Sequence, residues 1–508
     1  MFSGTVFSFL VGDFMANRQY FLSKSKYMDS LRCPKLLWCE YNNKSILPAE
    51  DESSKDVIEQ GMLVESFARK LFPDGITIER EHSPVKQLQK TRDAMKSRKP
   101  LFGAGFQYKE LYALADILNP VGKDEWDLYE VKSSTEAKPE HITDVAFQKY
   151  VYEKADVKIR HCYLMHINNE YVRKGEINPK QLFTSKDITE KCAGLFPSIE
   201  AGIKIAVKVI NAKAEPKVNI GFHCGNPWGC PLTEKCWSFL PEKDSVYSLY
   251  RGKSLALELI SKGILKITDI PKNVTLKGVQ PIQYTSHKNK EIHIDKPQIK
   301  LFLESLVFPL YLLDFETINP AIPVYDNSHP YDTIPFQYSL YRWDSLKDEP
   351  IKFGYIEQSK NDPRGQILKQ LKELLGQSGS VIAYNDSFEK NAIKNAAAVY
   401  DEYKDWAEVL EGRFIDLLVP FRSFYYYNPV QEGSASLKQV LPALTKMNYK
   451  NIAISNGGEA SGEYFRVTFG EDIAEKDRKA VYKALDKYCD IDTIGMAEII
   501  KALAKISK

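Results

Sequence analysis

The stretch from Leu111 to Tyr152 limits most strongly what this chain can fold into. It reads LYALADILNP, a short turn segment, WDLYEVKSS and then the helical run DVAFQKYVYE. The first two parts have the length and apolar content of strands, and the turn around Gly122–Asp124 would pair them. Residues two apart in a strand point to the same face, so Glu130 and Lys132 share a face, and Asp116 can arrive beside them.

Two carboxylates and an ammonium would then meet at one edge of a sheet. This combination suits hydrolysis of a phosphodiester, because the carboxylates can hold a divalent cation while the lysine orients a water or offsets charge. Gln148 and Tyr152 follow at i and i+4 on one helical face, where both can reach the same place. The alternative is ordinary, since a strand that ends in Glu-Val-Lys is more often a solvated sheet edge.

The order of these residues resembles the PD-(D/E)xK nucleases of the RecB type. The chain looks most like the CRISPR-associated RecB-like exonucleases. The resemblance implies metal-binding and catalytic roles for Asp116, Glu130 and Lys132, with Gln148 and Tyr152 in support.

One feature of the RecB-type pattern differs here. Those enzymes often carry an upstream histidine metal ligand on their first helix. The corresponding segment here is DVIEQGMLVESFARKLF, in which Glu65 is the nearest equivalent. A carboxylate could do the same work, so Glu65 is the expected third metal ligand.

A second group of candidate ligands consists of cysteines. Three of them lie in the Gly- and Pro-rich segment HCGNPWGCPLTEKC, at Cys224, Cys230 and Cys236. Five residues separate each neighbouring pair, a spacing that suits a loop around a metal centre. Cys33 is the expected fourth ligand, with Cys39 and His223 as alternatives. Four thiolates fit either an iron–sulfur cluster or structural zinc, although zinc sites usually contain a Cys-x-x-Cys pair.

One early and three late cysteines flanking a nuclease core resemble the [4Fe–4S] clasp of the RecB-like exonucleases. This resemblance covers roughly residues 20–240 and favours the cluster over zinc. On either interpretation the centre ties the two ends of the domain together and is not the hydrolytic site.

A second set of carboxylates lies in the C-terminal part of the chain. The apolar strand FPLYLLDFETINPAIP carries Asp314 and Glu316, which point to one face. Three later segments add polar residues: SVIAYNDSFEKNAI carries Asn385 and Glu389, GRFIDLLVPF carries Asp416, and LDKYCDIDTIGMAEII carries Tyr488 and Asp492 at i and i+4.

This order resembles the DEDD 3′–5′ exonucleases of the ribonuclease H-like fold. Their second motif ends in Asp where this chain has Glu389, and Asp386 lies nearby, so either could bind metal. The resemblance implies four carboxylates that hold two divalent cations about 4 Å apart. It also implies that Tyr488 positions the attacking water. The alternative is a catalytically silent domain that still binds nucleic acid.

Aromatic residues gather in FRSFYYYNP at 421–429 and QYSLYRW at 337–343. Such rings can stack on unpaired bases. Packing in the core is the more common explanation.

Length and composition set the outer limits. A chain of 508 residues is expected to form two or three domains, and its content of 44% hydrophobic and 27% charged residues is that of an ordinary globular protein. The net charge of +2 means that nucleic-acid binding must come from local patches. Eight cysteines without regular pairing favour a reducing, cytoplasmic setting.

Other segments narrow the class of protein. The apolar start MFSGTVFSFLVGDF lacks a basic leader and is broken by Asp13, which predicts a loose tail and neither a signal peptide nor a membrane span. The sequence contains no Walker phosphate loop, so an ATP-driven motor is not expected.

The sequence therefore predicts an α/β protein with four parts. These are a tail (1–20), a PD-(D/E)xK restriction-endonuclease-like nuclease domain with an iron–sulfur clasp (21–240), a helical linker (241–300) and a DEDD-type ribonuclease H-like domain (301–508). The last part looks like an uncharacterised domain found fused behind a RecB-like nuclease in microbial proteins.

The predicted activity is that of a metal-dependent deoxyribonuclease with two active sites, served by Mg²⁺ or Mn²⁺. Single-stranded DNA or duplex ends would be the substrate, in DNA repair, end processing or defence, with a helicase as an expected type of partner and no membrane association. The alternatives are an RNA-processing nuclease and a nucleic-acid-binding scaffold with one or both sites inactive.

Overall fold

The computed structural model divides the chain into two compact units, and each is described by itself. It describes residues 21–48, 52–81, 83–226, 229–450 and 452–508, so the predicted tail over 1–20 lies outside the described residues. The first unit is Met1–Trp237 with Ala321–Tyr331, and the second is Ser238–Pro320 with Asp332–Lys508. The segment predicted as a linker, 241–300, thus belongs to the second unit.

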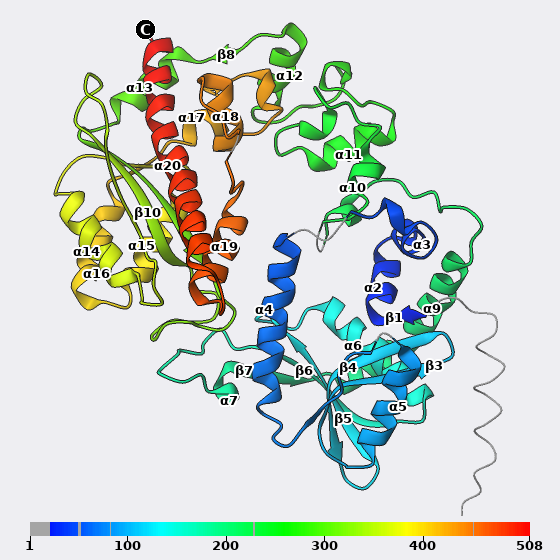
Figure 1. Ribbon diagram of the computed structural model, residues 1–508. Helices are drawn as coiled ribbons and strands as arrows, with labels where there is room; N and C mark the ends of the chain where they lie inside the picture. Colours follow the sequence, from blue (N-terminus) through cyan, green and yellow to red (C-terminus); the bar gives the residue numbers. More distant parts are fainter. Residues whose placement is uncertain (1–20, 49–51, 82, 227–228, 451) are drawn as a thin grey trace, which may run out of the picture. The chain divides into compact units, whose positions relative to one another are not determined.

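The first unit is built around a seven-stranded mixed sheet (Figure 1). Its strands are β1 (Leu22–Ser23), β2 (Ile76–Thr77), β3 (Leu101–Tyr108), β4 (Leu111–Val121), β5 (Glu125–Lys132), β6 (Lys158–Ile167) and β7 (Phe183–Asp187). Its helices are α2 (Lys24–Arg32), α3 (Pro34–Asn42), α4 (Glu52–Arg69), α5 (Pro84–Met95), α6 (Pro139–Lys154), α7 (Pro179–Leu182), α8 (Thr189–Gly194), α9 (Phe196–Ile210) and α10 (Thr233–Trp237).

The strands run in the order β2-β3-β4-β5-β6-β7, with the short β1 beside β4. The predicted hairpin is present, because β4 and β5 pair antiparallel from Ile117↔Tyr129 to Val121↔Glu125 across the turn at 122–124. β5 then pairs parallel with β6, and helix α6 makes the crossover between them. This arrangement places the end of β5 beside the helix that carries Gln148 and Tyr152.

Alternation along the strands gives this sheet two buried faces. Leu118 and Leu164 pack on the face covered by α6 and α9, whereas their neighbours Ile117 and Met165 pack on the other. The second face is covered by α4 and by the segment Ala321–Tyr331. Glu130 has the parity of Leu128 and points to the α6 face, while Val131 packs on the α4 face.

The second unit begins with short helices and continues into a sheet. Its helices are α11 (Lys253–Ser261), α12 (Gln280–Asn289), α13 (Lys296–Glu304), α14 (Arg364–Leu374), α15 (Ser387–Ala397), α16 (Asp401–Glu411), α17 (Val419–Arg422), α18 (Leu437–Leu444), α19 (Gly457–Phe469) and α20 (Glu475–Ile506). Its strands are β8 (His293–Ile294), β9 (Leu310–Ile318), β10 (Ile334–Trp343), β11 (Ile351–Ile356), β12 (Val381–Ala383), β13 (Phe414–Asp416) and β14 (Tyr426–Tyr427).

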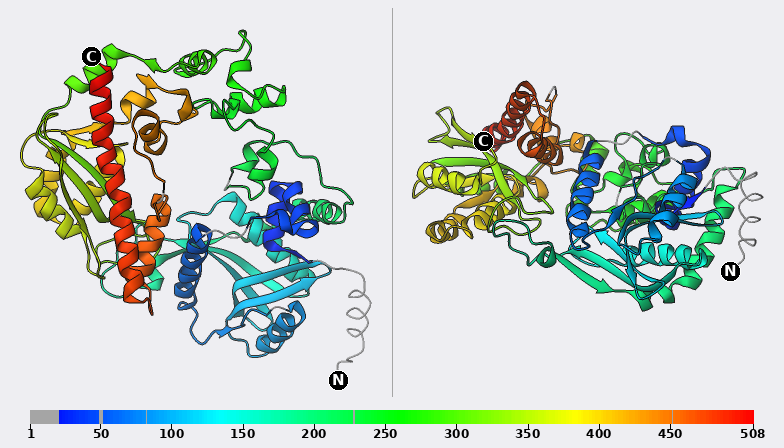
Figure 2. Two further views of the ribbon diagram at one scale, coloured as in Figure 1. Left: turned by 45° about the horizontal axis from the view of Figure 1, so that its top comes forward. Right: turned by 60° about the horizontal axis from the view of Figure 1, so that its bottom comes forward.

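Five of these strands form a mixed sheet in the order β11-β10-β9-β12-β13. β10 is antiparallel to both neighbours, whereas β12 is parallel to both of its neighbours. Leu310 and Leu312 point to the face covered by α13, α17, α18 and α20, and Tyr311 and Leu313 point to the face covered by α14, α15 and α16. The long helix α20 runs along the sheet in Figure 2 and contacts β9. Side chains of β9 that point to the same face as Leu312 therefore point toward α20.

The aromatic segments at 337–343 and 421–429 pack in the interior of this unit. Phe421, Phe424, Tyr427 and Trp343 are all essentially buried. The packing explanation is therefore confirmed for these rings, which are not available to stack on bases.

Both units mix helices and strands, and the chain is of the α/β class, as predicted. Within the described residues no helix is both long enough and apolar enough to cross a bilayer.

Candidate metal and catalytic centres

The first candidate centre is organised around the buried carboxylate of Glu130. One of its oxygens, Oε1, accepts hydrogen bonds from Lys132 Nζ at 2.6 Å and Lys24 Nζ at 2.7 Å. The other, Oε2, accepts one from Gln148 Nε2 at 2.6 Å. The Tyr152 hydroxyl donates to Gln148 Oε1 at 3.4 Å and so helps to fix which way that amide faces. The structure thus brings together the four predicted residues from β5 and α6.

Asp116 lies beside this group, at the point where the β4–β5 pairing ends. Its Oδ2 accepts the backbone N–H of Val131 at 2.8 Å. Burial and the nearby Glu130 carboxylate raise the pKa of Asp116 to about 8. Glu65, on α4, is close enough to add to the same shift, although it also pairs with Arg69 at 2.6 Å. The five predicted residues and Glu65 therefore share one neighbourhood.

Two charged residues of this centre escaped the sequence analysis. Asp144 Oδ2 accepts a hydrogen bond from Lys132 Nζ at 2.6 Å, and Asp144 Oδ1 lies 3.5 Å from Lys24 Nζ. It could have been found, because it lies one helical turn before Gln148. Lys24 is 106 residues from Glu130 and comes from α2, so no local pattern links them.

Charge at the first centre is largely balanced by the two ammonium groups. Burial alone would raise the pKa of Glu130, but Lys132 and Lys24 outweigh it and hold that pKa well below its usual range. Burial would lower the pKa of Lys132, and Glu130 and Asp144 reverse the effect. Glu130 is therefore ionised, and the lysines facing it stay protonated.

The four predicted cysteines line one small cavity. Cys33 lies between α2 and α3, and Cys224, Cys230 and Cys236 come from the late loop and α10. The Arg32 guanidinium donates to the carbonyl oxygens of His223 at 3.2 Å and Cys224 at 3.3 Å, which ties the early helix to the late loop. His223 lines the cavity as well, whereas Cys39 is buried next to it and does not line it.

The spacing of these thiols bears on what could be held there. Burial raises the pKa of the Cys230 thiol, and Cys33 and Cys224 are near enough to raise it further. Within the described residues, the groups of three ligand atoms that lie within 4.8 Å of one another do not include these sulfurs. A tetrahedral zinc ion with Zn–S bonds of about 2.3 Å would hold its sulfurs about 3.8 Å apart.

The second candidate centre is a buried cluster of carboxylates from β9, α15 and α20 of the second unit. Asp314 and Glu316 share the parity of Leu312 on β9, and Glu389 comes from the first turn of α15. Burial raises the pKa of Asp314 and of Glu316 well above the usual range, and repulsion by Asp492 adds to both shifts. The pKa of Glu389 is raised in the same way, by burial and by Asp314. One oxygen of Glu389, Oε2, is buried and accepts no hydrogen bond.

The environment distinguishes Glu389 from its neighbour Asp386. Asp386 pairs with Lys390 at 2.6 Å, one turn along α15. Glu389 is 3% exposed and interacts with Asp314 and Glu316. Of the two alternatives left open by the sequence, Glu389 is the one directed at the cluster.

Helix α20 contributes the remaining predicted residues. Asp492 accepts a hydrogen bond from the Tyr449 hydroxyl at 2.5 Å, and burial raises its pKa to about 6. Tyr488, one turn earlier, is 4% exposed. Burial together with Asp492, Glu316 and Asp314 raises the pKa of Tyr488, so its hydroxyl stays protonated.

Two further side chains of this centre were not predicted. Cys489 follows Tyr488 and places its Sγ 3.3 Å from Asp314 Oδ2, in a group with Asp314 and Glu316 whose ligand atoms lie within 4.8 Å. Lys438, on α18, is the cation that acts on Glu316 and Asp492. Its place in GSASLKQVLP predicts a helix start but gives no hint of this contact.

Asp416 lies at the end of β13, and its carboxylate accepts hydrogen bonds from the backbone. Its Oδ1 accepts the N–H groups of Asn385 and Leu418, both at 2.9 Å, and its Oδ2 pairs with Arg422 at 2.9 Å. These partners make it a structural residue at the end of the sheet.

One family model matches part of this chain. Residues 311–436 match the model of a domain of unknown function, DUF2779. This region contains Asp314, Glu316 and Glu389, and it ends before Tyr488 and Asp492.

Part of the chain is also similar to three mycoplasma proteins whose names describe them only as uncharacterised. The chain is 28% identical over 229 residues to protein UU173 of Ureaplasma parvum serovar 3, covering 40% of this chain and 32% of that protein. It is 26% identical over 218 residues to protein MG366 of Mycoplasma genitalium, covering 38% and 32%. The MG366 homolog of Mycoplasma pneumoniae is 26% identical over 211 residues, covering 37% and 31%. The matched regions thus span about a third of each relative's length.

Proposed function

We propose that this chain is a metal-dependent nuclease with two active sites that hydrolyses DNA phosphodiester bonds. The first unit would be a RecB-like PD-(D/E)xK nuclease with an iron–sulfur clasp. The second would be a ribonuclease H-like exonuclease of the DEDD type. The observation that carries the proposal is the buried carboxylate cluster of the second unit.

A bound cation would offset the charge of that cluster. Asp314, Glu316, Glu389 and Asp492 come from three elements, and burial raises the pKa of each. Neighbouring carboxylates raise it further for the first three, and Lys438 is a cation that acts on Glu316 and Asp492. Burying several carboxylates together is costly unless their charge is compensated. The orphaned Oε2 of Glu389 points to the same need. Hard carboxylate ligands fit Mg²⁺ or Mn²⁺, which would polarise a phosphoryl oxygen and acidify a water.

The remaining residues of this cluster have roles that follow from their contacts. Tyr488 stays protonated and can donate a hydrogen bond that orients a water. Tyr449 holds the Asp492 carboxylate through a hydrogen bond. The strand order, with three antiparallel strands followed by two parallel ones, supports a ribonuclease H-like fold.

The first centre supports the proposal in a different way. Asp116, Glu130 and Glu65 can serve as metal ligands, while Lys132 and Lys24 are placed to bind the substrate's phosphate or to offset charge. Gln148, held by Tyr152, orients Glu130. Because two lysines already compensate Glu130, we expect this centre to bind its cation more weakly than the second.

The cysteine cavity fits the proposed cluster by its donor chemistry. The four cysteines line one cavity, and within the described residues no three of their sulfurs lie within 4.8 Å of one another, whereas a tetrahedral zinc would hold its sulfurs about 3.8 Å apart. Bound there, an iron–sulfur cluster would supply a structural cross-link between the early and late parts of the unit.

An activity assay with matched variants tests the proposal. The substrates are end-labelled single-stranded DNA, duplex DNA and RNA, each with Mg²⁺ or Mn²⁺. Glu316→Gln should lower the part of the cleavage that the second centre performs by about 100-fold or more, because it removes a ligand charge while keeping the size of the side chain. Asp401→Asn is the control, since the Asp401 side chain is 94% exposed and pairs with Lys404 at 2.6 Å at the start of α16, and it should retain activity.

The outcomes separate the alternatives. DNA cleavage that requires Glu316 supports the proposal, and cleavage of RNA alone would move the substrate to RNA. If no substrate is cut although the protein binds them, the chain is a nucleic-acid-binding scaffold.

A further inference from the structure

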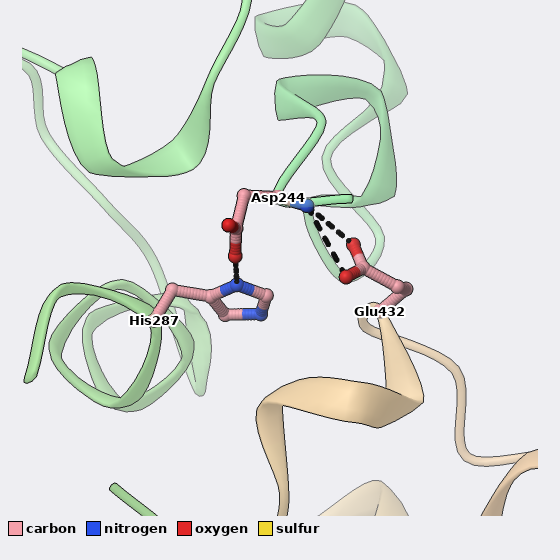
Figure 3. A group of neighbouring side chains, drawn as sticks. All are labelled: Asp244, His287 and Glu432. Carbon is pink, nitrogen blue, oxygen red and sulfur yellow. Dashed lines mark hydrogen bonds and ion pairs between the residues drawn. The ribbon is translucent and has the colours of Figure 1, made fainter. Parts of the chain in front are cut away.

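We propose that Asp244, His287 and Glu432 form a third metal site, which binds a divalent transition-metal ion such as Zn²⁺. It lies in the second unit, apart from the carboxylate cluster. Its three ligand atoms lie within 4.8 Å of one another. Figure 3 shows the Asp244 carboxylate facing the His287 ring, and the Glu432 carboxylate facing the backbone nitrogen of Asp244.

The His287 ring is fixed in the way that a ligand ring needs. Its side chain is fully buried, and its Nδ1 faces the Asp244 carboxylate. On the opposite side, Nε2 lies 2.7 Å from the Tyr427 hydroxyl, which also accepts the N–H of Gly433 at 3.1 Å. A ligand histidine commonly has its second nitrogen held by such an outer partner, which sets the ring orientation and tautomer.

The two carboxylates are held in place by the backbone. Asp244 has φ +58° and Glu432 has φ +46°, both in the left-handed region that residues other than glycine adopt uncommonly. Such strain persists only where the surroundings fix it, and it gathers at functional sites. The Asp244 N–H lies 3.1 and 3.0 Å from the two Glu432 oxygens, and Ser248 Oγ donates to Oε2 at 3.3 Å. Each carboxylate oxygen keeps a further lone pair for an ion.

The donor set selects the type of ion. One imidazole nitrogen and two carboxylate oxygens suit Zn²⁺ better than Mg²⁺, which prefers oxygen alone. The ion would take the place of the proton between Nδ1 and Asp244, and that proton would leave to solvent. The Asp244 side chain is 42% exposed, so the ion has a path in and a position open to water.

The site would join segments that are far apart in the sequence. Asp244 precedes the first helices of the unit, His287 lies on α12, and Glu432 follows β14. An ion bound to all three would cross-link the helical segment 238–294 to the segment 426–433. The expected role is therefore structural.

Cobalt binding to the full chain tests the site, because Co²⁺ substitutes for Zn²⁺ and its absorption reports the ligands. His287→Asn keeps a donor near the Nδ1 position but removes a good ligand. Glu432→Gln keeps an acceptor for the Asp244 N–H and removes the charge. His161→Asn is the matched control, because His161 Nδ1 pairs with Asp187 at 3.0 Å on the surface of the first unit.

The cysteines and the carboxylate cluster are unchanged in all four proteins, so their signals cancel in difference spectra. Relative to wild type and His161→Asn, both site variants should lose one bound Co²⁺ with nitrogen and oxygen ligands and no thiolate band. Zn²⁺ should raise the Tm of wild type more than that of either variant. Equal cobalt binding by all four folded proteins, or no such ion in the wild type, would overturn the proposal.

Discussion

At the scale of the residue, the two candidate centres differ in how their buried carboxylates are compensated. Glu130 is compensated by Lys132 and Lys24 at hydrogen-bond distance. Asp314, Glu316 and Glu389 face each other instead, and Lys438 offsets only part of their charge. A divalent cation should therefore change the stability of the second unit more than that of the first.

The pH dependence of stability follows from Asp116. Its folded pKa is raised to about 8, against about 3.9 in an unfolded chain, so the folded state holds the proton more tightly. This contribution to stability is fully present below pH about 4 and is lost as pH rises through about 8. With a metal chelator present, the free energy of unfolding of the wild type should therefore fall more between pH about 4 and about 8 than that of Asp116→Asn.

Asn is a suitable replacement because its amide oxygen can still accept the Val131 N–H. Urea unfolding at several pH values measures the difference. Parallel pH profiles for the two proteins would contradict the assigned shift.

Residues that are close together in the sequence could be predicted to share a site, because local geometry brings them together. Asp116, Glu130, Lys132 and Gln148 lie within one hairpin and the following helix, so strand and helix periods bring them together. Lys24 and Lys438 arrive from distant elements, and only tertiary packing places them. The choice between Asp386 and Glu389 also required the structure, since both lie near the start of one helix and its direction decides which faces the cluster.

At the scale of the element, β9 and α20 build the second centre. The period of two along β9 puts Asp314 and Glu316 on the face of Leu312, and α20 covers that face. The sequence predicted the shared face. It did not predict that α20 runs from Glu475 to Ile506 or that Cys489 would touch Asp314.

A glycine provides a test of packing between elements. Gly433 has φ +73°, and a Cβ there would lie 1.9 Å from the Ser248 carbonyl oxygen and 2.7 Å from Gln283 Nε2. Gly433→Ala should destabilise the protein by roughly 1–3 kcal/mol for the strained backbone alone, and by more for the clash. Gly263→Ala is the control, since it has φ +78° with no atom within 4 Å of the new Cβ. Denaturant unfolding should rank Gly433→Ala as clearly the less stable, and equal losses would rule out the close approach.

At the scale of the whole molecule, separate parts of the chain hold separate groups of candidate metal ligands. The cysteine cavity joins early and late segments of the first unit, and this joining was predicted from one early and three late cysteines. The sequence favoured Cys33 as the fourth ligand over Cys39 and His223, and in the structure Cys33 and His223 line the cavity whereas Cys39 does not. Distance along the chain does not reveal which of these side chains line the cavity.

Iron content tests the clasp. Protein purified without oxygen should contain iron and acid-labile sulfide, and Cys230→Ser should lose most of both because thiolates are the ligands of such clusters. Cys39→Ser should keep them, since Cys39 is buried beside the cavity but does not line it. Zinc in place of iron in the wild type would exclude the cluster.

The most direct test of the two-site account is one cleavage experiment on four anaerobically purified proteins. These are wild type, Lys132→Met, Asp314→Asn and the double variant, each given end-labelled DNA with Mn²⁺. Each single variant should lose a distinct part of the product pattern, by about 100-fold or more, and the double variant should be inactive. Undiminished cleavage by the double variant would contradict the account, because it would place the activity in neither centre.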